Sequence, residues 1–222
     1  MEFYANQIFH VYNQGNNRQT IFYSEENYNY FIWKVKAYVL PFADIVSYCL
    51  MPNHFHWQLY VKLVEMDRKS LREHVDSIEN KRRIEKFGEN ANPIDSLSLS
   101  RISKKEKITL SDSIGILQSS YTRAINSENG WSGSLFRKEC KANDGWIGEF
   151  LISNRSHKNE FKFNIGNDYA FTCMEYIHDN PVKAGLVKNR VDRSFSSAKD
   201  YAGMREKSIC NLELGKKLMG FM

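Results

Sequence analysis

The sequence contains few cysteines, and they form no pattern. Only four of its 222 residues are cysteines, and no two of them make a Cys-x-x-Cys pair. They stand at Cys49, Cys140, Cys173 and Cys210. This spacing argues against a zinc site built from thiolates and against a disulfide framework. It fits a protein of the reducing cytosol, so we expect a cytoplasmic location.

Long apolar segments and a strong charge of one sign are also missing. No run approaches the roughly 20 apolar residues that span a bilayer, and the opening MEFYANQIFH lacks the basic patch and apolar core of a signal peptide. We therefore expect no membrane partner. The 31 basic and 26 acidic residues give a net charge of +5. This mild excess suits a polyanionic partner but does not identify one.

The composition is that of a globular protein, with 42% hydrophobic and 14% aromatic residues. The length predicts a single domain over residues 1–222 with insertions at about 79–107 and 145–166 and a C-terminal extension at about 202–222. The first insertion is rich in Lys and Arg, which could contact phosphates. Because its charges alternate in sign, we favour a solvated loop there.

Periodicity predicts alternating strands and helices. Strands are expected at 7–13, 43–51, 54–63 and 134–142. Helices are expected from the N-cap Ser24 to Pro41, over 70–77 as the start of a second helix, and at 110–126. A last helix is expected from Asn167 or Asp168 to about 179, near Pro181. The central strands should form a hairpin that turns at Pro52-Asn53. This order predicts an α+β fold with an antiparallel sheet.

The strand after the turn carries a His-x-His pair. Side chains two apart on a strand point the same way, so His54 and His56 share one face, while the aromatic residues between and after them share the other. Two imidazoles on one face can ligate a metal, or they can be ordinary half-exposed residues. His10, in the first strand, reads as a packed sheet residue and not as a ligand.

The last long helix brings a phenol and an amide onto one face. Tyr176 and Asn180 are four residues apart, which places them about 40° apart around a helix. Taken alone, Tyr176 could be a packed tyrosine with a solvated hydroxyl, and Asn180 could be a helix C-cap. Tyr121, on the 110–126 helix, is a second candidate nucleophile, although its apolar neighbours favour a core position.

Two strings together resemble a known family. MPNHFH at 51–56 and MEYIHDNPVKAGLV at 174–187 are similar to the motifs of the REP-associated tyrosine transposases and related single-tyrosine His-hydrophobic-His (HUH) insertion-sequence transposases. HVYNQGNNRQTIF and GWSGSLFRKECKA also resemble segments of that family. The resemblance implies a ferredoxin-like or RRM-like sandwich, with helices on one face of the sheet and the tyrosine helix near the histidine face.

The resemblance also implies a site and a reaction. Tyr176 would be the nucleophile, and His54, His56 and Asn180 would hold Mg²⁺ or Mn²⁺. The product would be a 5′-phosphotyrosine on single-stranded DNA near a hairpin, with a free 3′-hydroxyl. The basic residues expected to contact this DNA are Arg18, Arg137, Lys138 and Lys141. The oligomeric state stays open between a monomer and a homodimer.

Two other functions remain open at this point. A ferredoxin-like sheet that carries aromatics can bind single strands without cutting them. Such a module could derive from a transposase that has lost its activity. The same ligands could also serve a metal-dependent hydrolase that forms no covalent adduct.

Overall fold

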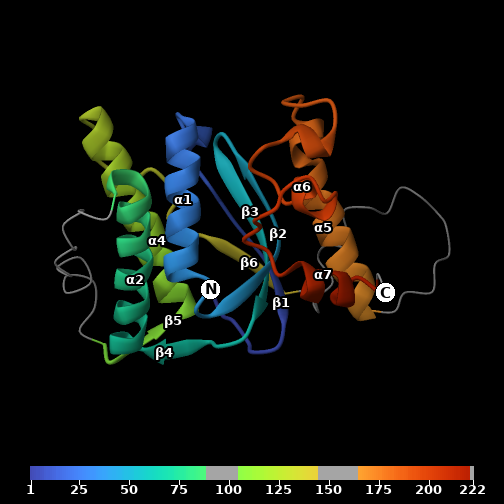
Figure 1. Cartoon of the computed structure of the whole chain (residues 1–222), viewed down its shortest axis with the longest axis horizontal. Helices are drawn as coiled ribbons and strands as arrows, with labels where there is room; N and C mark the ends of the chain where they lie inside the picture. Colours follow the sequence, from blue (N-terminus) through green and yellow to red (C-terminus); the bar gives the residue numbers. More distant parts are fainter. Residues whose placement is uncertain (89–104, 145–164, 221–222) are drawn as a thin grey trace.

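A four-stranded antiparallel sheet forms the centre of the molecule (Figure 1). The computed structural model describes residues 1–88, 105–144 and 165–220. The sheet has the order β2-β3-β1-β6, from β1 (Ile8–Gln14), β2 (Ala43–Met51), β3 (His54–Val61) and β6 (Lys141–Asp144). With one helix between β1 and β2 and further helices between β3 and β6, this is the ferredoxin-like order. The predicted α+β class and antiparallel sheet are confirmed.

Helices cover both faces of this sheet (Figure 1). On one side lie α1 (Glu25–Tyr38), α2 (Arg68–Phe87) and α4 (Leu110–Asn129). On the other side lie α5 (Ile165–Lys183), α6 (Ala198–Tyr201) and α7 (Leu212–Leu218). The tyrosine helix α5 lies on the histidine face, as expected, where it buries the β2 side chains Cys49 and Met51. The expectation that the other helices share the opposite face holds for α1, α2 and α4 and is wrong for α6 and α7. Of the described helices, none is long and apolar enough to cross a membrane.

Short elements complete the chain. A 3-10 turn, η1 (Asn16–Arg18), follows β1, and a second, η2 (Arg190–Asp192), follows α5. Next to α2 and α4, β4 (Glu65–Asp67) pairs with β5 (Lys107–Thr109). The second strand of this small sheet, β5, begins at Lys107, the last residue of the segment that we expected as the first insertion. The loop that we favoured over 79–107 is wrong for residues 79–87, which continue α2, and residues 89–104 are outside the described part.

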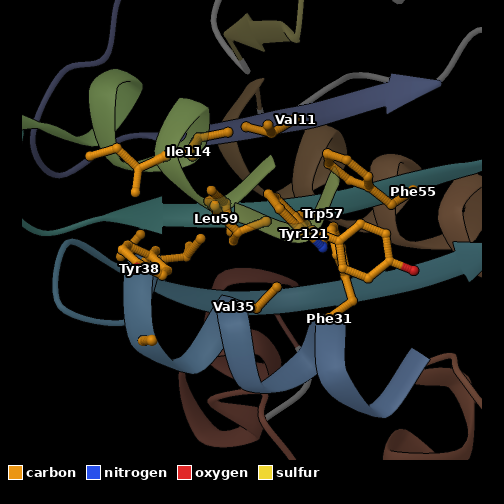
Figure 2. Packing of buried hydrophobic residues seen from close by; sticks show 14 of the residues in the cluster. Val11, Phe31, Val35, Tyr38, Phe55, Trp57, Leu59, Ile114 and Tyr121 are labelled. Carbon is orange, nitrogen blue, oxygen red and sulfur yellow. The ribbon is translucent and has the colours of Figure 1, made fainter. Parts of the chain in front are cut away.

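The main core lies between the sheet and helices α1 and α4. The alternation predicted for β3 is observed: Phe55, Trp57 and Leu59 point into this core. Figure 2 shows them meeting side chains of α1 and α4, among them Phe31, Val35, Tyr38, Ile114 and Tyr121. Burial of one whole face of β3 fixes its register, because a slip by one residue would turn the aromatic face outward.

Local signals placed most element starts correctly. The Ser24 side chain accepts a hydrogen bond from the Asn27 backbone N–H at the start of α1, as an N-cap does. The hairpin turns at Pro52-Asn53, with Met51 paired to His54 across it. The strand expected at 134–142 is wrong, because only 141–144 forms β6. Before it, Phe136 makes a single bridge to Gly15.

The end of α5 also differs from the prediction. Pro181 lies inside the helix, which continues to Lys183. Pro181 has no N–H, so the helical hydrogen bond to the Ile177 carbonyl is missing. Gly185, with φ of 67°, reverses the chain just after the helix, and the Ala184 N–H still donates to the Asn180 carbonyl (2.9 Å). Asn180 is therefore an interior helix residue and not a C-cap.

A buried ion pair joins α1 to α2. The Lys34 Nζ lies 2.5 Å from Glu79 Oε1, and both residues are less than 10% exposed. Without Lys34 the buried Glu79 carboxylate keeps only Arg82 as a partner (Nε to Oε2, 2.9 Å), so we expect Lys34→Met to lower the free energy of unfolding by about 1.5–3 kcal/mol. Chemical denaturation measures this. The double variant Lys34→Met/Glu79→Leu should recover most of the loss, and a double variant no more stable than the single one would contradict the account.

Candidate active site

A pocket of about 230 Å³ opens where β1, β3 and α5 come together. The strands supply one wall, and α5 supplies the opposite one. The chain leading into β6 closes a third side. Its lining is polar and aromatic, and comprises Tyr12, Asn13, Gln14, His54, His56, Arg137, Glu139, Lys141, Tyr176 and Asn180. Four residues that the sequence singled out as nucleophile or metal ligands therefore face one space.

His54 stands at the start of β3 and is half-buried. Its Nδ1 lies 2.6 Å from Asn53 Oδ1, and the ring also hydrogen-bonds the Asn180 side chain. Burial lowers the pKa of His54, although the contact with Asn180 opposes this. The imidazole is thus held between the hairpin turn and helix α5.

His56 is more deeply placed, at 5% exposure. Its Nδ1 lies 2.9 Å from His10 Nε2, and the two rings stack with centroids 5.1 Å apart. Antiparallel pairing sets this contact: Tyr12 lies opposite His56, so His10 is its diagonal neighbour on the same face. His10 is buried, as predicted, but the sequence did not reveal its contact with His56. Among the described residues, His10 Nδ1 has no hydrogen-bond partner.

The imidazoles in and beside the pocket are held neutral. Burial, and then the neighbouring imidazoles of His10 and His54, lower the pKa of His56 well below its usual value. Burial alone lowers the pKa of His10 to about 4. Metal ligation uses the neutral form of histidine. The environment of His54 and His56 therefore favours the form that a cation needs.

These buried histidines predict sensitivity to acid. Burial lowers the pKa of His178, on α5, to about 3, and Arg190 adds to the effect. The unfolded chain binds protons near pH 6.5, so between about pH 6.5 and 4 it holds more protons than the folded one. We expect unfolding free energy to fall with pH through this window, by roughly 3 kcal/mol for each of His10 and His178. Urea denaturation from pH 8 to pH 4 measures the slope, and a flat profile would contradict it.

Tyr176 reaches the pocket from α5. Its ring centroid lies 5.6 Å from that of His56 and 5.7 Å from that of His10, both edge to face. The Asn180 Nδ2 donates to the Tyr176 carbonyl (3.1 Å), which leaves the amide oxygen as the donor atom for the pocket. One turn of helix therefore presents a phenol and an amide together, as the i, i+4 spacing predicts.

Lys183 was not recognised from the sequence. Its Nζ lies 5.8 Å from the centre of the Tyr176 ring. Residues seven apart on a helix share a face, so the contact follows once α5 runs through Pro181. The mistaken helix end at Pro181 concealed it.

The basic residues divide between this pocket and its surroundings. Arg137 and Lys141 line the pocket, and the Arg137 backbone N–H donates to the Gln14 carbonyl (2.8 Å). Lys138 lines a neighbouring groove that shares Lys141 and runs between β6 and α4. Arg18 is exposed in η1 and touches the site through its backbone carbonyl, which accepts from Asn53 Nδ2 (3.2 Å).

Tyr121, the alternative nucleophile, lies elsewhere. Its side chain is fully buried in the core on the opposite face of the sheet (Figure 2). Its hydroxyl donates to the Ile21 carbonyl (2.7 Å), and burial raises its pKa strongly. A phenol with a buried, satisfied hydroxyl does not meet a substrate.

The donor set of the pocket fits a divalent cation. Among the described residues, no three His, Cys, Asp or Glu side chains form a metal cluster. The predicted set instead combines two neutral imidazoles with one amide oxygen, and all three side chains line the same pocket. Mixed nitrogen and oxygen donors suit Mn²⁺ or a catalytic Mg²⁺.

Comparison with known proteins shows a similarity in fold. No protein-family model matches the chain, and no curated protein sequence matches it. Among solved structures, the chain is similar to a REP-associated tyrosine transposase bound to a REP hairpin, with 14% identity and a TM-score of 0.50 over 94% of this chain and 87% of that one. The two share a fold. At this identity the likeness extends to the mixed α+β architecture and no further.

Proposed function

We propose that this protein is a single-stranded DNA transposase that cleaves and rejoins DNA through Tyr176. The observation that carries the proposal is the convergence of Tyr176, Asn180, His54 and His56 on one pocket, from two elements far apart in the sequence. The shared fold with a hairpin-bound transposase supports it. The hairpin as recognition element is part of the proposal.

The chemistry assigned to Tyr176 is transfer of a phosphodiester. Its phenol oxygen attacks phosphorus, the bond from phosphorus to the 3′ oxygen breaks, and that oxygen leaves as a 3′-hydroxyl. The phosphorus stays joined to the 5′ oxygen of the downstream fragment, as a 5′-phosphotyrosine. Attack by a 3′-hydroxyl on this link reverses the step and rejoins strands. The phenol loses its proton during attack and the leaving 3′ oxygen gains one, so the step is balanced in protons.

The residues around Tyr176 would position this step. His54, His56 and Asn180 would hold Mg²⁺ or Mn²⁺, which when bound acts as a Lewis acid on a non-bridging phosphate oxygen. Lys183, above the Tyr176 ring, would supply positive charge next to the developing phenolate. Each group reaches the pocket from a regular element or a tight turn, so the site is held by a rigid frame.

Single-stranded DNA would approach along the β6 side. Arg137 and Lys141 stand in the pocket, and Lys138 extends the basic lining into the groove between β6 and α4. Such contacts neutralise phosphates and carry no base specificity. Arg18, exposed next to the hairpin turn, would add a further phosphate contact.

Covalent trapping tests the proposal. Purified protein is incubated with a panel of single-stranded oligonucleotides that carry hairpins and a 3′ label or a 5′ label, with Mn²⁺ or with chelator. We expect a protein–DNA adduct that survives denaturing electrophoresis, depends on the metal, and retains the label of the 3′ fragment. Cleavage without an adduct would favour the hydrolase instead. Binding with neither would leave the non-cleaving module.

A further inference from the structure

Asn53 links the hairpin turn to His54 through hydrogen bonds whose direction is fixed. Its Nδ2 donates to the Arg18 carbonyl (3.2 Å), and its Oδ1 lies 2.6 Å from His54 Nδ1. A carbonyl can only accept, so the amide group must turn its nitrogen toward Arg18 and its oxygen toward His54. The amide oxygen in turn can only accept. The contact with Asn53 therefore favours a proton on His54 Nδ1.

The backbone around Asn53 is held in place from the same side. The Asn53 carbonyl accepts from the Gly15 N–H (2.8 Å), and the Pro52 carbonyl accepts from the Ile21 N–H (2.8 Å). Between these anchors, Asn17 and Arg18 both have left-handed backbones, with φ of 50° and 59°. Such conformations cost an L residue roughly 1–2 kcal/mol each. The strained turn presents the Arg18 carbonyl to Asn53.

We propose that Asn53 is a positioning residue that locks His54 in the tautomer protonated at Nδ1, which leaves the Nε2 lone pair for a divalent cation. The inference rests on the proposed function, because it assumes that His54 is a metal ligand. Metal-bound histidines commonly donate their second ring N–H to a fixed acceptor, and loss of that acceptor costs about 10–100-fold in metal affinity. Asn53 is such an acceptor.

The second imidazole lacks an equivalent lock. The partner of His56 Nδ1 is the His10 ring, and a neutral imidazole nitrogen can be either donor or acceptor. The contact between His10 and His56 thus leaves both tautomers open. At His54 the Asn53 oxygen sets a direction at Nδ1, and the Asn180 side chain, which also hydrogen-bonds this ring, would give up that contact to a cation bound at Nε2.

Nuclear magnetic resonance of the metal-free protein tests the lock. Long-range ¹H–¹⁵N correlation of the histidine rings at pH 8 reports which ring nitrogen carries the proton, and His54→Ala identifies the His54 signals. We expect wild type to show protonated Nδ1 and bare Nε2 at His54. Asn53→Leu, which has similar volume and no acceptor, should give mixed tautomers. Asn53→Asp keeps the acceptor oxygen and should keep the wild-type pattern.

Titration with Mn²⁺ alone gives the second readout. We expect Asn53→Leu to bind Mn²⁺ about 10–100-fold more weakly, and Asn53→Asp to stay within about threefold of wild type or to bind more tightly. Circular dichroism checks that both variants are folded, and Asn53→Asp keeps the test decisive should Asn53→Leu unfold. The proposal is overturned by wild-type His54 protonated at Nε2, by an unchanged tautomer and affinity in Asn53→Leu, or by mixed tautomers in Asn53→Asp.

The two proposals fail separately. A wild-type protein that never forms a DNA adduct, yet shows the Nδ1-protonated His54, would remove the transposase function and leave the lock intact. A wild-type protein that forms the adduct while His54 is protonated at Nε2 would do the reverse.

Discussion

Replacing Tyr176 with phenylalanine is expected to abolish the covalent DNA adduct. The variant removes one oxygen atom and keeps the ring that packs edge to face on His56 and His10, so the fold and the pocket should persist. Loss of a nucleophile removes the covalent step itself, and comparable deletions cost about 10⁴–10⁶-fold in rate. The yield of adduct after denaturing electrophoresis measures it. Binding of the same oligonucleotide should change by less than about threefold.

Tyr121→Phe is the matched control for this result. It makes the same chemical change on α4, where the hydroxyl donates to the Ile21 carbonyl inside the core. Loss of that bond leaves a buried carbonyl without its partner, so we expect a stability loss of about 1–3 kcal/mol and an unchanged adduct yield per folded molecule. The opposite pattern, in which Tyr121→Phe abolishes the adduct and Tyr176→Phe does not, would move the nucleophile to Tyr121.

The parts of the site that local sequence predicts are those governed by fixed periodicities. A strand has a two-residue repeat, so His54 and His56 had to share a face wherever the strand lay. A helix places residues four apart together, which joined Tyr176 to Asn180. The family resemblance then linked the two elements. In the folded chain the four residues line one pocket.

The supporting residues depend on pairing between distant strands, which local patterns do not contain. His10 reaches His56 only because β1 pairs with β3 in a register that sets Tyr12 opposite His56. Asn53 read as a turn residue, and its bond to His54 appears only when η1 supplies the Arg18 carbonyl. The contact of Lys183 with Tyr176 was missed because we assumed that Pro181 ends the helix. The contacts of His10 and Asn53 are set by tertiary structure, whereas the contact of Lys183 with Tyr176 follows from the length of α5.

Substitution of the predicted ligands should separate metal binding from stability. We expect His54→Ala and His56→Ala each to weaken Mn²⁺ binding by more than about 100-fold, since loss of an outer acceptor alone costs about 10–100-fold. Adduct formation should fall with it. The two variants differ in the fold: His54 is half-buried, whereas His56 is 5% exposed and is the only described hydrogen-bond partner of the buried His10 ring. His56→Ala should therefore also lose about 2–4 kcal/mol of stability, from the cavity and the unpaired imidazole.

Asn180 provides the finest test of the metal site. Asn180→Asp keeps an oxygen donor and adds a charge, so it should bind Mn²⁺ at least as tightly as wild type, whereas Asn180→Ala should bind about 10-fold or more weakly. His74→Ala is the control, because His74 contacts the Lys36 carbonyl on the far side of the sheet (3.1 Å) and should leave Mn²⁺ binding unchanged. Isothermal titration with Mn²⁺ gives the affinities without DNA. Equal Mn²⁺ affinity in wild type, His54→Ala and Asn180→Ala would show that the cation binds elsewhere. The pocket would then not be the metal site.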